Sequence, residues 1–212
     1  MGKSNVGGRI KIFLFFCCFT VFKLDGQVIS INTNNTSLVY RAAKDGQLQQ
    51  IYFGKKLQDE KEYQAISQTP NTAFPGGGAT YSHEPAMEVI HSDGNSSLQL
   101  NYVSHTSEQQ NPDVSLTTIR LKDPAYPFFV TLYVKAFLKE DVMETWTSIQ
   151  HEEKSTVILQ RYASAFLSIN GDRFFLTHFY GDWASEMQIE EPPLPEVLYT
   201  VQSKLGTREA ND

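Results

Sequence analysis

After position 27 the chain is a succession of short runs rich in β-branched and aromatic residues, separated by turn-forming residues. In residues 128–137 apolar side chains recur at every even-numbered position, with Thr131, Tyr133 and Lys135 between them. A period of two places one set of side chains against a core and the other toward solvent or a second layer. Similar runs lie at residues 28–32, 37–43, 48–53, 87–91, 98–105 and 114–121. The pattern predicts an all-β fold, a large antiparallel β-sandwich of about ten short strands.

Two local signals refine this expectation. Asn170-Gly171 stands between two apolar and aromatic runs, and Asn-Gly is typical of a type I′ turn. A β-hairpin is therefore predicted over residues 165–180. Residues 55–67 are the nearest approach to a helical pattern, but their high charge density predicts only a short surface helix or a loop.

The first 26 residues have the composition of a secretory signal peptide. Basic residues at positions 3, 9 and 11 precede an uncharged, Phe-rich run from Ile12 to Phe22, which Lys23 ends. This run of 11 residues is too short to cross a bilayer, which takes roughly 17–25. A basic start, a short apolar middle and the small Gly26 predict cleavage near position 26 and a secreted or periplasmic protein.

Two alternatives stay open for this segment, a membrane anchor and a buried apolar segment. Cys17 and Cys18 would suit a lipid anchor. The bulky Phe15 and Phe16 directly before them depart from the usual lipoprotein cleavage pattern, and this favours the cleaved signal.

The charge balance argues against nucleic acid as a partner. The chain has 18 basic and 24 acidic residues, a formal charge of −6. Losing the first 26 residues removes four basic residues and one acidic residue, which leaves 14 and 23 and a charge of −9. Nucleic-acid binding needs a basic face. Both cysteines also leave with the signal, so the exported form has no disulfide, no thiolate nucleophile and no cysteine-ligated zinc, and no cofactor is indicated.

Two features that often mark ligand sites have little support here. Gly76-Gly77-Gly78 lacks the Lys-Ser/Thr of a phosphate loop, so a flexible or tightly turned surface loop is expected. Its surroundings, residues 71–83 with Phe74 and Tyr81, form the type of loop on which binding surfaces are built. The five histidines never show metal-ligand spacing, so a metal site would have to be assembled across strands. His178 is expected to be a hydrogen-bonded core or rim residue.

Asp182-Trp183 is the part of the chain with the most evident chemistry. A Trp ring stacks on the apolar face of a sugar ring, while a neighbouring carboxylate accepts hydrogen bonds from hydroxyls. The alternative is that Trp183 closes the sandwich core and Asp182 completes a turn with Gly181. Asp182 and Glu186 could also form a glycosidase acid pair, which needs carboxyls about 5–9.5 Å apart, but two acids at a strand edge are usually solvated.

Several segments, taken in order, resemble the N-terminal domain of glycoside hydrolase family 36, whose typical members are retaining α-galactosidases. These segments are residues 84–87, 91–95, 98–105, 140–146, 161–165, 177–186 and 203–208. The likeness is strongest over 177–186 and extends from Val28 to Arg208. It implies a supersandwich-like β domain over residues 27–208, between the signal peptide at 1–26 and a truncated tail at 209–212.

In the family this domain precedes a much larger (β/α)8 barrel that carries two catalytic aspartates. No segment of this sequence matches them, so no catalytic residue is expected in the chain and its own enzymatic activity stays uncertain. The resemblance also implies α-galactosides as ligands and a homo-oligomer for the full enzyme. Trp183 matches the tryptophan that the family sends into the galactose pocket, with Asp182 beside it, whereas Tyr180 and Ser185 replace a common His and Arg. Residues 71–84 match a loop that can approach a neighbouring active site.

Two functions of different class follow from these observations. The first is the accessory domain of an α-galactosidase, which is inactive alone but shapes a galactoside pocket and oligomer contacts. The second is an independent carbohydrate-binding or assembly module without hydrolase activity. A sandwich fold by itself supports neither, because the same architecture serves many functions.

Overall fold

The computed structural model describes residues 26–66, 71–78, 84–171, 173–182, 185–194 and 198–201. The predicted signal peptide, including both cysteines, lies outside this part apart from Gly26. The chain divides into two compact units, Met1–Phe166 and Leu167–Asp212. Within the described residues, no helix is both long and apolar enough to span a bilayer.

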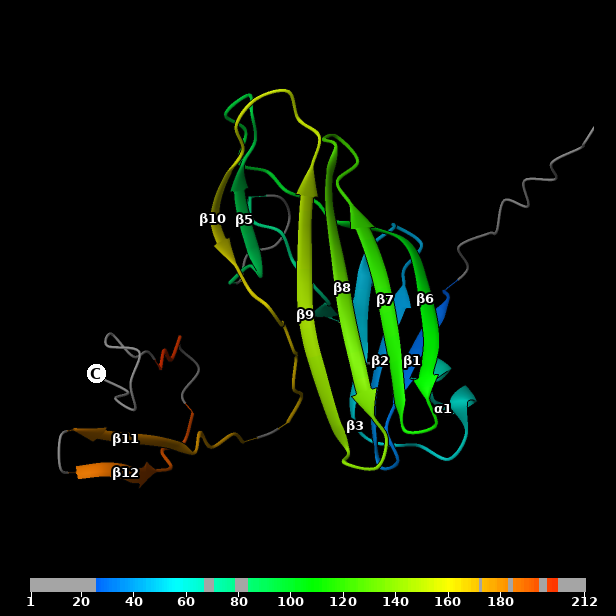
Figure 1. The fold of residues 1–212 in the computed structure, drawn as a ribbon, viewed down its shortest axis with the longest axis vertical. Coiled ribbons are helices and arrows are strands. Elements are labelled where there is room, and N and C mark those ends of the chain that lie inside the picture. Colours follow the sequence, from blue (N-terminus) through cyan, green and yellow to red (C-terminus); the bar gives the residue numbers. More distant parts are fainter. Residues whose placement is uncertain are drawn as a thin grey trace, which may run out of the picture. The chain divides into compact units, whose positions relative to one another are not determined.

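The first unit is built almost entirely from antiparallel strands (Figure 1). The first sheet has the order β1-β2-β3-β4, the second sheet has the order β6-β7-β8-β9, and β5 pairs with β10. The one described helix is α1 (Glu60–Gln64). The strands are β1 (Val28–Asn32), β2 (Thr36–Ala42), β3 (Leu48–Lys55), β4 (Asn71–Thr72), β5 (Met87–Ile90), β6 (Asn101–Asn111), β7 (Val114–Lys122), β8 (Phe128–Phe137), β9 (Val142–His151) and β10 (Ile158–Tyr162).

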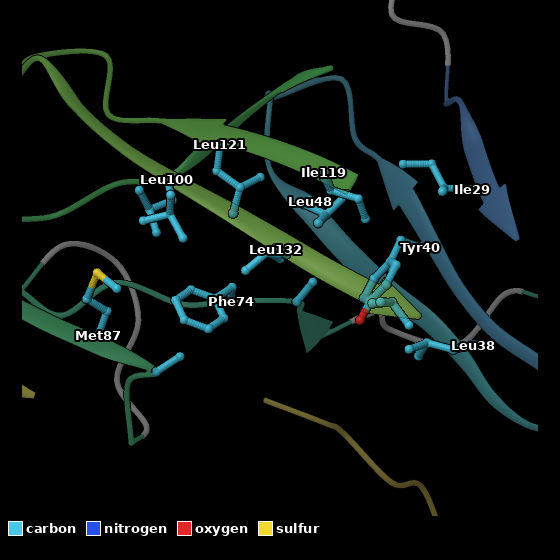
Figure 2. Close-up of a cluster of buried hydrophobic side chains, with 14 of the residues drawn as sticks. Ile29, Leu38, Tyr40, Leu48, Phe74, Met87, Leu100, Ile119, Leu121 and Leu132 are labelled. Atoms are coloured by element: carbon cyan, nitrogen blue, oxygen red, sulfur yellow. The ribbon is translucent and has the colours of Figure 1, made fainter. Parts of the chain in front are cut away.

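The two larger sheets share one hydrophobic core, as expected for a sandwich. Along β8 buried and partly exposed residues alternate without interruption, which confirms the period-two pattern of the sequence. Figure 2 shows Leu121 and Leu132 of the second sheet in one cluster with Tyr40 and Leu48 of the first. Burial raises the pKa of the Tyr40 phenol well above its ordinary value, so the ring stays neutral in this core. The all-β sandwich prediction is confirmed.

A second, smaller cluster covers the opposite face of the first sheet. Val39 and Ile51 point to this face and pack with Tyr63 of α1, which is 1% exposed. The Tyr63 hydroxyl donates to Ser37 Oγ at 2.8 Å and accepts from the Leu57 amide at 3.0 Å. This segment was expected to be a short surface helix or a loop, and it forms a short helix whose tyrosine closes one side of the sheet.

Asp141 joins the two sheets at one end of the sandwich. It lies in the turn between β8 and β9 and has a φ of 58°. Its carboxylate accepts hydrogen bonds from the Thr33 hydroxyl, the Asn35 amide and the Thr36 hydroxyl, which belong to the β1–β2 turn. The hydrogen bond from Thr33, followed by those from Asn35 and Thr36, lowers the pKa of Asp141 below its usual value although partial desolvation opposes it.

The second unit contains a hairpin, but the predicted turn position was wrong. The hairpin consists of β11 (His178–Asp182) and β12 (Ser185–Glu190), and residues 165–171 form no strand. Two contacts explain the difference. Phe166 packs against the core of the first unit, and the chain around Phe175 bridges to Pro193 instead of pairing backward. Asn-Gly permits a tight turn, but the available pairing partners decide where the ladder forms.

Candidate functional site

Asp182, one of the two sequence-predicted substrate contacts, is the last residue of β11 in the β11–β12 hairpin. Its register pairs Tyr180 with Gln188 and Asp182 with Ser185. Between these pairs β12 carries an extra residue, and Met187 takes a φ of 60° in this irregularity. Bulges of this kind bend a strand and redirect the side chains beyond them. The irregularity therefore lies immediately before the segment that joins Asp182 to Ser185.

Trp183 lies outside the described residues, as do the side chains of Asp182 and Glu186. The backbone of Asp182 ends β11, and Trp183 follows it directly in the sequence. Neither the core position nor the sugar-contacting position of Trp183 is tested by this structure, and the acid pair of Asp182 and Glu186 is likewise untested.

His178 is held by polar partners at the start of β11. Its side chain is 13% exposed, and Nε2 lies 3.5 Å from Glu190 Oε2. The Tyr199 hydroxyl lies 3.2 Å from the same Nε2 atom, and the two rings are tilted with centroids 6.0 Å apart. Nδ1 has no hydrogen-bond partner among the described residues. The prediction of a hydrogen-bonded core or rim histidine is confirmed, and Glu190 and Tyr199 are the partners that sequence reasoning missed.

The second unit exposes many large apolar side chains. Phe179 and Ile189 face each other across the hairpin and are 51% and 65% exposed. The others are Leu167, Ile169, Phe174, Phe175, Tyr180, Met187, Leu194, Leu198, Tyr199 and Val201. Contiguous apolar surface on a folded protein usually marks a contact with another protein surface, a ligand or a membrane.

The glycine-rich segment is packed against the core, so its prediction as a surface loop was wrong. Gly76 and Gly77 are buried, and Phe74 is 3% exposed in the main core. A Cβ on Gly76 would lie 2.2 Å from the Leu98 carbonyl oxygen, which no real contact allows. These glycines let the backbone pack closely between Met87 of β5 and Leu98, since Gly77 hydrogen-bonds to both residues. Tyr81 lies outside the described residues.

A buried contact in the first unit joins the side chains of His91 and Glu153. His91 Nδ1 lies 2.8 Å from Glu153 Oε1, and the Ser92 amide donates to Glu153 Oε2 at 2.9 Å. The His91 ring stacks on Tyr126 with centroids 3.7 Å apart. In the described part of the chain, no cluster of three or more His, Cys, Asp or Glu side chains is arranged to hold a metal ion. The contact joins the turn after β5 to the loop after β9.

One family model and several solved structures match this chain. Residues 46–212 match the model of the glycosyl hydrolase family 36 N-terminal domain. The α-galactosidase from Lactobacillus brevis is similar in structure, with a TM-score of 0.73 and 18% identity over 82% of this chain and 28% of the other. The family 36 α-galactosidase AgaA from Geobacillus stearothermophilus has a TM-score of 0.71 and 21% sequence identity, over 80% of this chain and 28% of AgaA. The family 36 α-galactosidase AgaB from the same organism has a TM-score of 0.68 and 22% sequence identity, over 79% of this chain and 27% of AgaB.

The chain thus spans less than a third of the length of these solved relatives. The comparison with curated proteins gives no match. At these identities the structural likeness concerns the fold, and it agrees with the β-sandwich described above.

Proposed function

The chain belongs to the family of the glycosyl hydrolase family 36 N-terminal domain, and on this basis we propose that it is the accessory domain of an α-galactosidase-like enzyme. In this role it is non-catalytic on its own and completes a galactoside pocket built mainly by a (β/α)8 barrel. Trp183 and Asp182 are its proposed substrate contacts. Its ligands are α-galactosides, and it uses no metal or cofactor.

The single observation that carries this proposal is the position of Asp182 at the closed end of the β11–β12 hairpin. The ladder and its irregularity stop there, and Trp183 is the next residue. A Trp ring at a hairpin end has the shape needed to cover one face of a sugar ring, because the indole supplies a broad apolar surface. A carboxylate next to it accepts hydrogen bonds from the hydroxyls at the ring edge.

The proposal that this chain lacks its own catalytic machinery rests on the requirement for two carboxyls. Retaining glycosidases hold them about 5–5.5 Å apart on either side of the scissile bond. Asp182 and Glu186 are the acid pair considered from the sequence, and they belong to the two paired strands β11 and β12. The solved relatives are more than three times as long as the matched region, which leaves ample chain in those proteins for a catalytic domain.

The apolar surface of the second unit supports the proposed contacts with a barrel or with another copy. Phe175, Phe179, Ile189 and Leu198 are each more than half exposed. Covering such side chains contributes about 25 cal/mol for every Å² of apolar surface removed from water. We therefore include assembly, as a homo-oligomer of the full enzyme, in the proposed role.

The alternative is an independent carbohydrate-binding module, and the two roles differ in one measurable respect. An accessory domain binds the galactose-like inhibitor 1-deoxygalactonojirimycin, which AgaA is described with, only when a barrel is present. An independent module binds α-galactosides by itself. Calorimetric titration of the purified chain, alone and co-expressed with a family 36 barrel, separates the two roles.

The test uses matched variants of the hairpin. With the barrel present, Trp183→Ala is expected to weaken inhibitor binding at least tenfold, Trp183→Phe to weaken it less, and Tyr180→Phe to leave it unchanged. The chain alone is expected to give no hydrolysis of an aryl α-galactoside above the buffer blank. Turnover by the chain alone that Asp182→Asn abolishes would contradict the proposal and assign catalysis to Asp182.

A further inference from the structure

The outward face of the second sheet carries a groove that belongs to the first unit alone. Along β8, the residues that alternate with the buried set point to this face. The groove has a volume of about 550 Å³. Its lining comes from β6, β7, β8 and β9, chiefly Arg120, Lys122, Phe129, Thr131, Tyr133 and Ser148.

Strand register arranges these side chains in three rows across the sheet. Thr131 is the register partner of both Arg120 and Ser148, and these three residues form the middle row. On one side, Thr118, Tyr133 and Trp146 form the next row, and on the other side Lys122, Phe129 and Gln150 do so. Residues two apart on a strand point to the same face. The middle row is therefore polar and has an aromatic side chain on each side. We call the three rows together the outer trough.

The aromatic walls are well defined. The Tyr133 and Trp146 rings are stacked, with centroids 4.9 Å apart and planes 5° from parallel. Phe129 lies four residues along β8 from Tyr133, which corresponds to about 13 Å. Lys122 Nζ lies 5.5 Å from the centre of the Phe129 ring. The trough thus offers two aromatic surfaces with short hydroxyl side chains, Thr131 and Ser148, between them.

The charge of the outer trough differs in sign from that of the whole chain. The chain carries a formal charge of −6, whereas Arg120 and Lys122 line the trough and no Asp or Glu is among its described lining residues. Within the described part of the chain, no carboxylate forms an ion pair with Arg120 or Lys122. In the register, Glu108 and Glu144 lie in the row beyond Thr118, Tyr133 and Trp146, where they are opposite Leu116 and Lys135 respectively.

We propose that the outer trough binds an anionic saccharide chain. Aromatic faces pack against the apolar faces of sugar rings, and the Thr131 and Ser148 hydroxyls and the Gln150 amide exchange hydrogen bonds with sugar hydroxyls. The Arg120 guanidinium binds a carboxylate or sulfate group through two parallel hydrogen bonds, and Lys122 supplies a second positive charge. Lys122 lies over the Phe129 ring, but neither Lys122 nor Arg120 has a carboxylate partner among the described residues, and an anionic saccharide supplies one where a neutral chain does not.

The test measures binding of the full chain to oligogalacturonate, a carboxylated saccharide, and to a sulfated saccharide from heparin. A neutral galactan and a short single-stranded DNA serve as comparison ligands. We expect one or both anionic saccharides to bind at least tenfold more tightly than the galactan and the DNA. Arg120→Gln is expected to weaken that binding about tenfold, in line with the loss of a charged hydrogen-bond pair. Trp146→Ala is expected to weaken it comparably.

Two control variants keep the result interpretable. Lys139→Gln removes the same charge from an exposed turn of the same sheet, where Lys139 pairs with Asp113, and is expected to leave binding unchanged. Trp183→Ala is expected to leave binding of the anionic saccharide unchanged as well. The anionic-saccharide proposal can therefore fail without affecting the galactoside proposal, and the reverse also holds. Equal affinity for the galactan, equal affinity for DNA, or full binding by Arg120→Gln with retained thermal stability would each overturn the proposal.

Discussion

Glu153 Oε1 lies 2.8 Å from Nδ1 of His91, and the two side chains are almost completely buried, at 2% and 0% exposed. This contact, together with the Ser92 amide on Oε2, fastens the loop after β9 to the turn after β5. The Tyr126 ring stacks on the His91 ring, and its hydroxyl donates a hydrogen bond to the Asp93 carboxylate at 2.9 Å. The segment between β7 and β8 therefore belongs to the same cluster.

Stability at low pH should depend on Glu153. Burial raises the pKa of Glu153, but hydrogen bonds from His91 and Ser92 outweigh it, so the pKa is lowered on folding. A lowered pKa stabilises the fold at any pH above the unfolded value of about 4.3, and this contribution is lost as pH falls through the folded value. Glu153→Ala should cost about 2 kcal/mol at neutral pH by leaving buried donors unpaired.

The measurement is urea unfolding at several pH values between neutral and acid. The stability difference between Glu153→Ala and the parent should shrink as the pH falls, because protonation removes the same interactions in the parent. Glu152→Ala, a substitution of the exposed neighbour, is the control. A difference that does not change with pH would show that the contribution of Glu153 is packing and not its charge.

Gly76→Ala should destabilise the first unit strongly. The added methyl group would lie 2.2 Å from the Leu98 carbonyl oxygen and 2.9 Å from its carbonyl carbon, and backbone atoms cannot give way locally. Overpacking of this kind costs about 1–3 kcal/mol or more. Gly54→Ala is the matched control, because its nearest neighbour is the movable Tyr52 hydroxyl at 3.2 Å. Equal melting temperatures for the two variants would contradict the close packing at Gly76.

The effect of Trp183→Ala on stability separates its two roles. If Trp183 projects toward a pocket completed by another domain, the substitution in this chain should cost about 1 kcal/mol or less, as for surface changes. If Trp183 fills the sandwich, the cost should be about 3–5 kcal/mol, the usual penalty for deleting a buried aromatic side chain. Thermal unfolding of the purified chain makes the comparison, and we expect the smaller value.

Export should remove both cysteines. Cleavage near Gly26 would leave a chain that gives no free-thiol signal after denaturation, because Cys17 and Cys18 are the only cysteines. Mass spectrometry of the exported protein measures the new N-terminus directly. A retained N-terminus, or a lipid mass on either cysteine, would instead support the membrane-anchor alternative.

The sequence predicted the fold well because the period-two pattern is a local property. Alternation along β8 identifies the buried set without knowledge of its neighbours. Turn position was harder, since Asn170-Gly171 permits a hairpin whereas pairing around Phe175 and Pro193 decides where one forms. Gly76 illustrates a related difficulty, because a glycine needed for close packing has the same appearance in sequence as one in a flexible loop.

The two candidate sites also differ in how far the sequence alone could predict them. Asp182 and Trp183 are adjacent in sequence, so their pairing was visible as a dipeptide. The outer trough was not visible, because Arg120, Thr131 and Ser148 come from three strands and meet only through the register of β7, β8 and β9. Such a row of polar side chains between aromatic ones can therefore be recognised only when the strand register is known.

The hydrogen bond between Thr33 and Asp141 spans 108 positions of the chain, and this has a consequence for how the protein folds. Loop closure over such a separation is entropically costly, and folds dominated by distant contacts form slowly. During synthesis, the first sheet emerges well before residue 141, and until then Ile31, Leu38 and Leu48 have no opposing sheet to cover them. In a nascent chain these apolar side chains therefore stay without their native covering from the completion of β3 until β8 and β9 arrive.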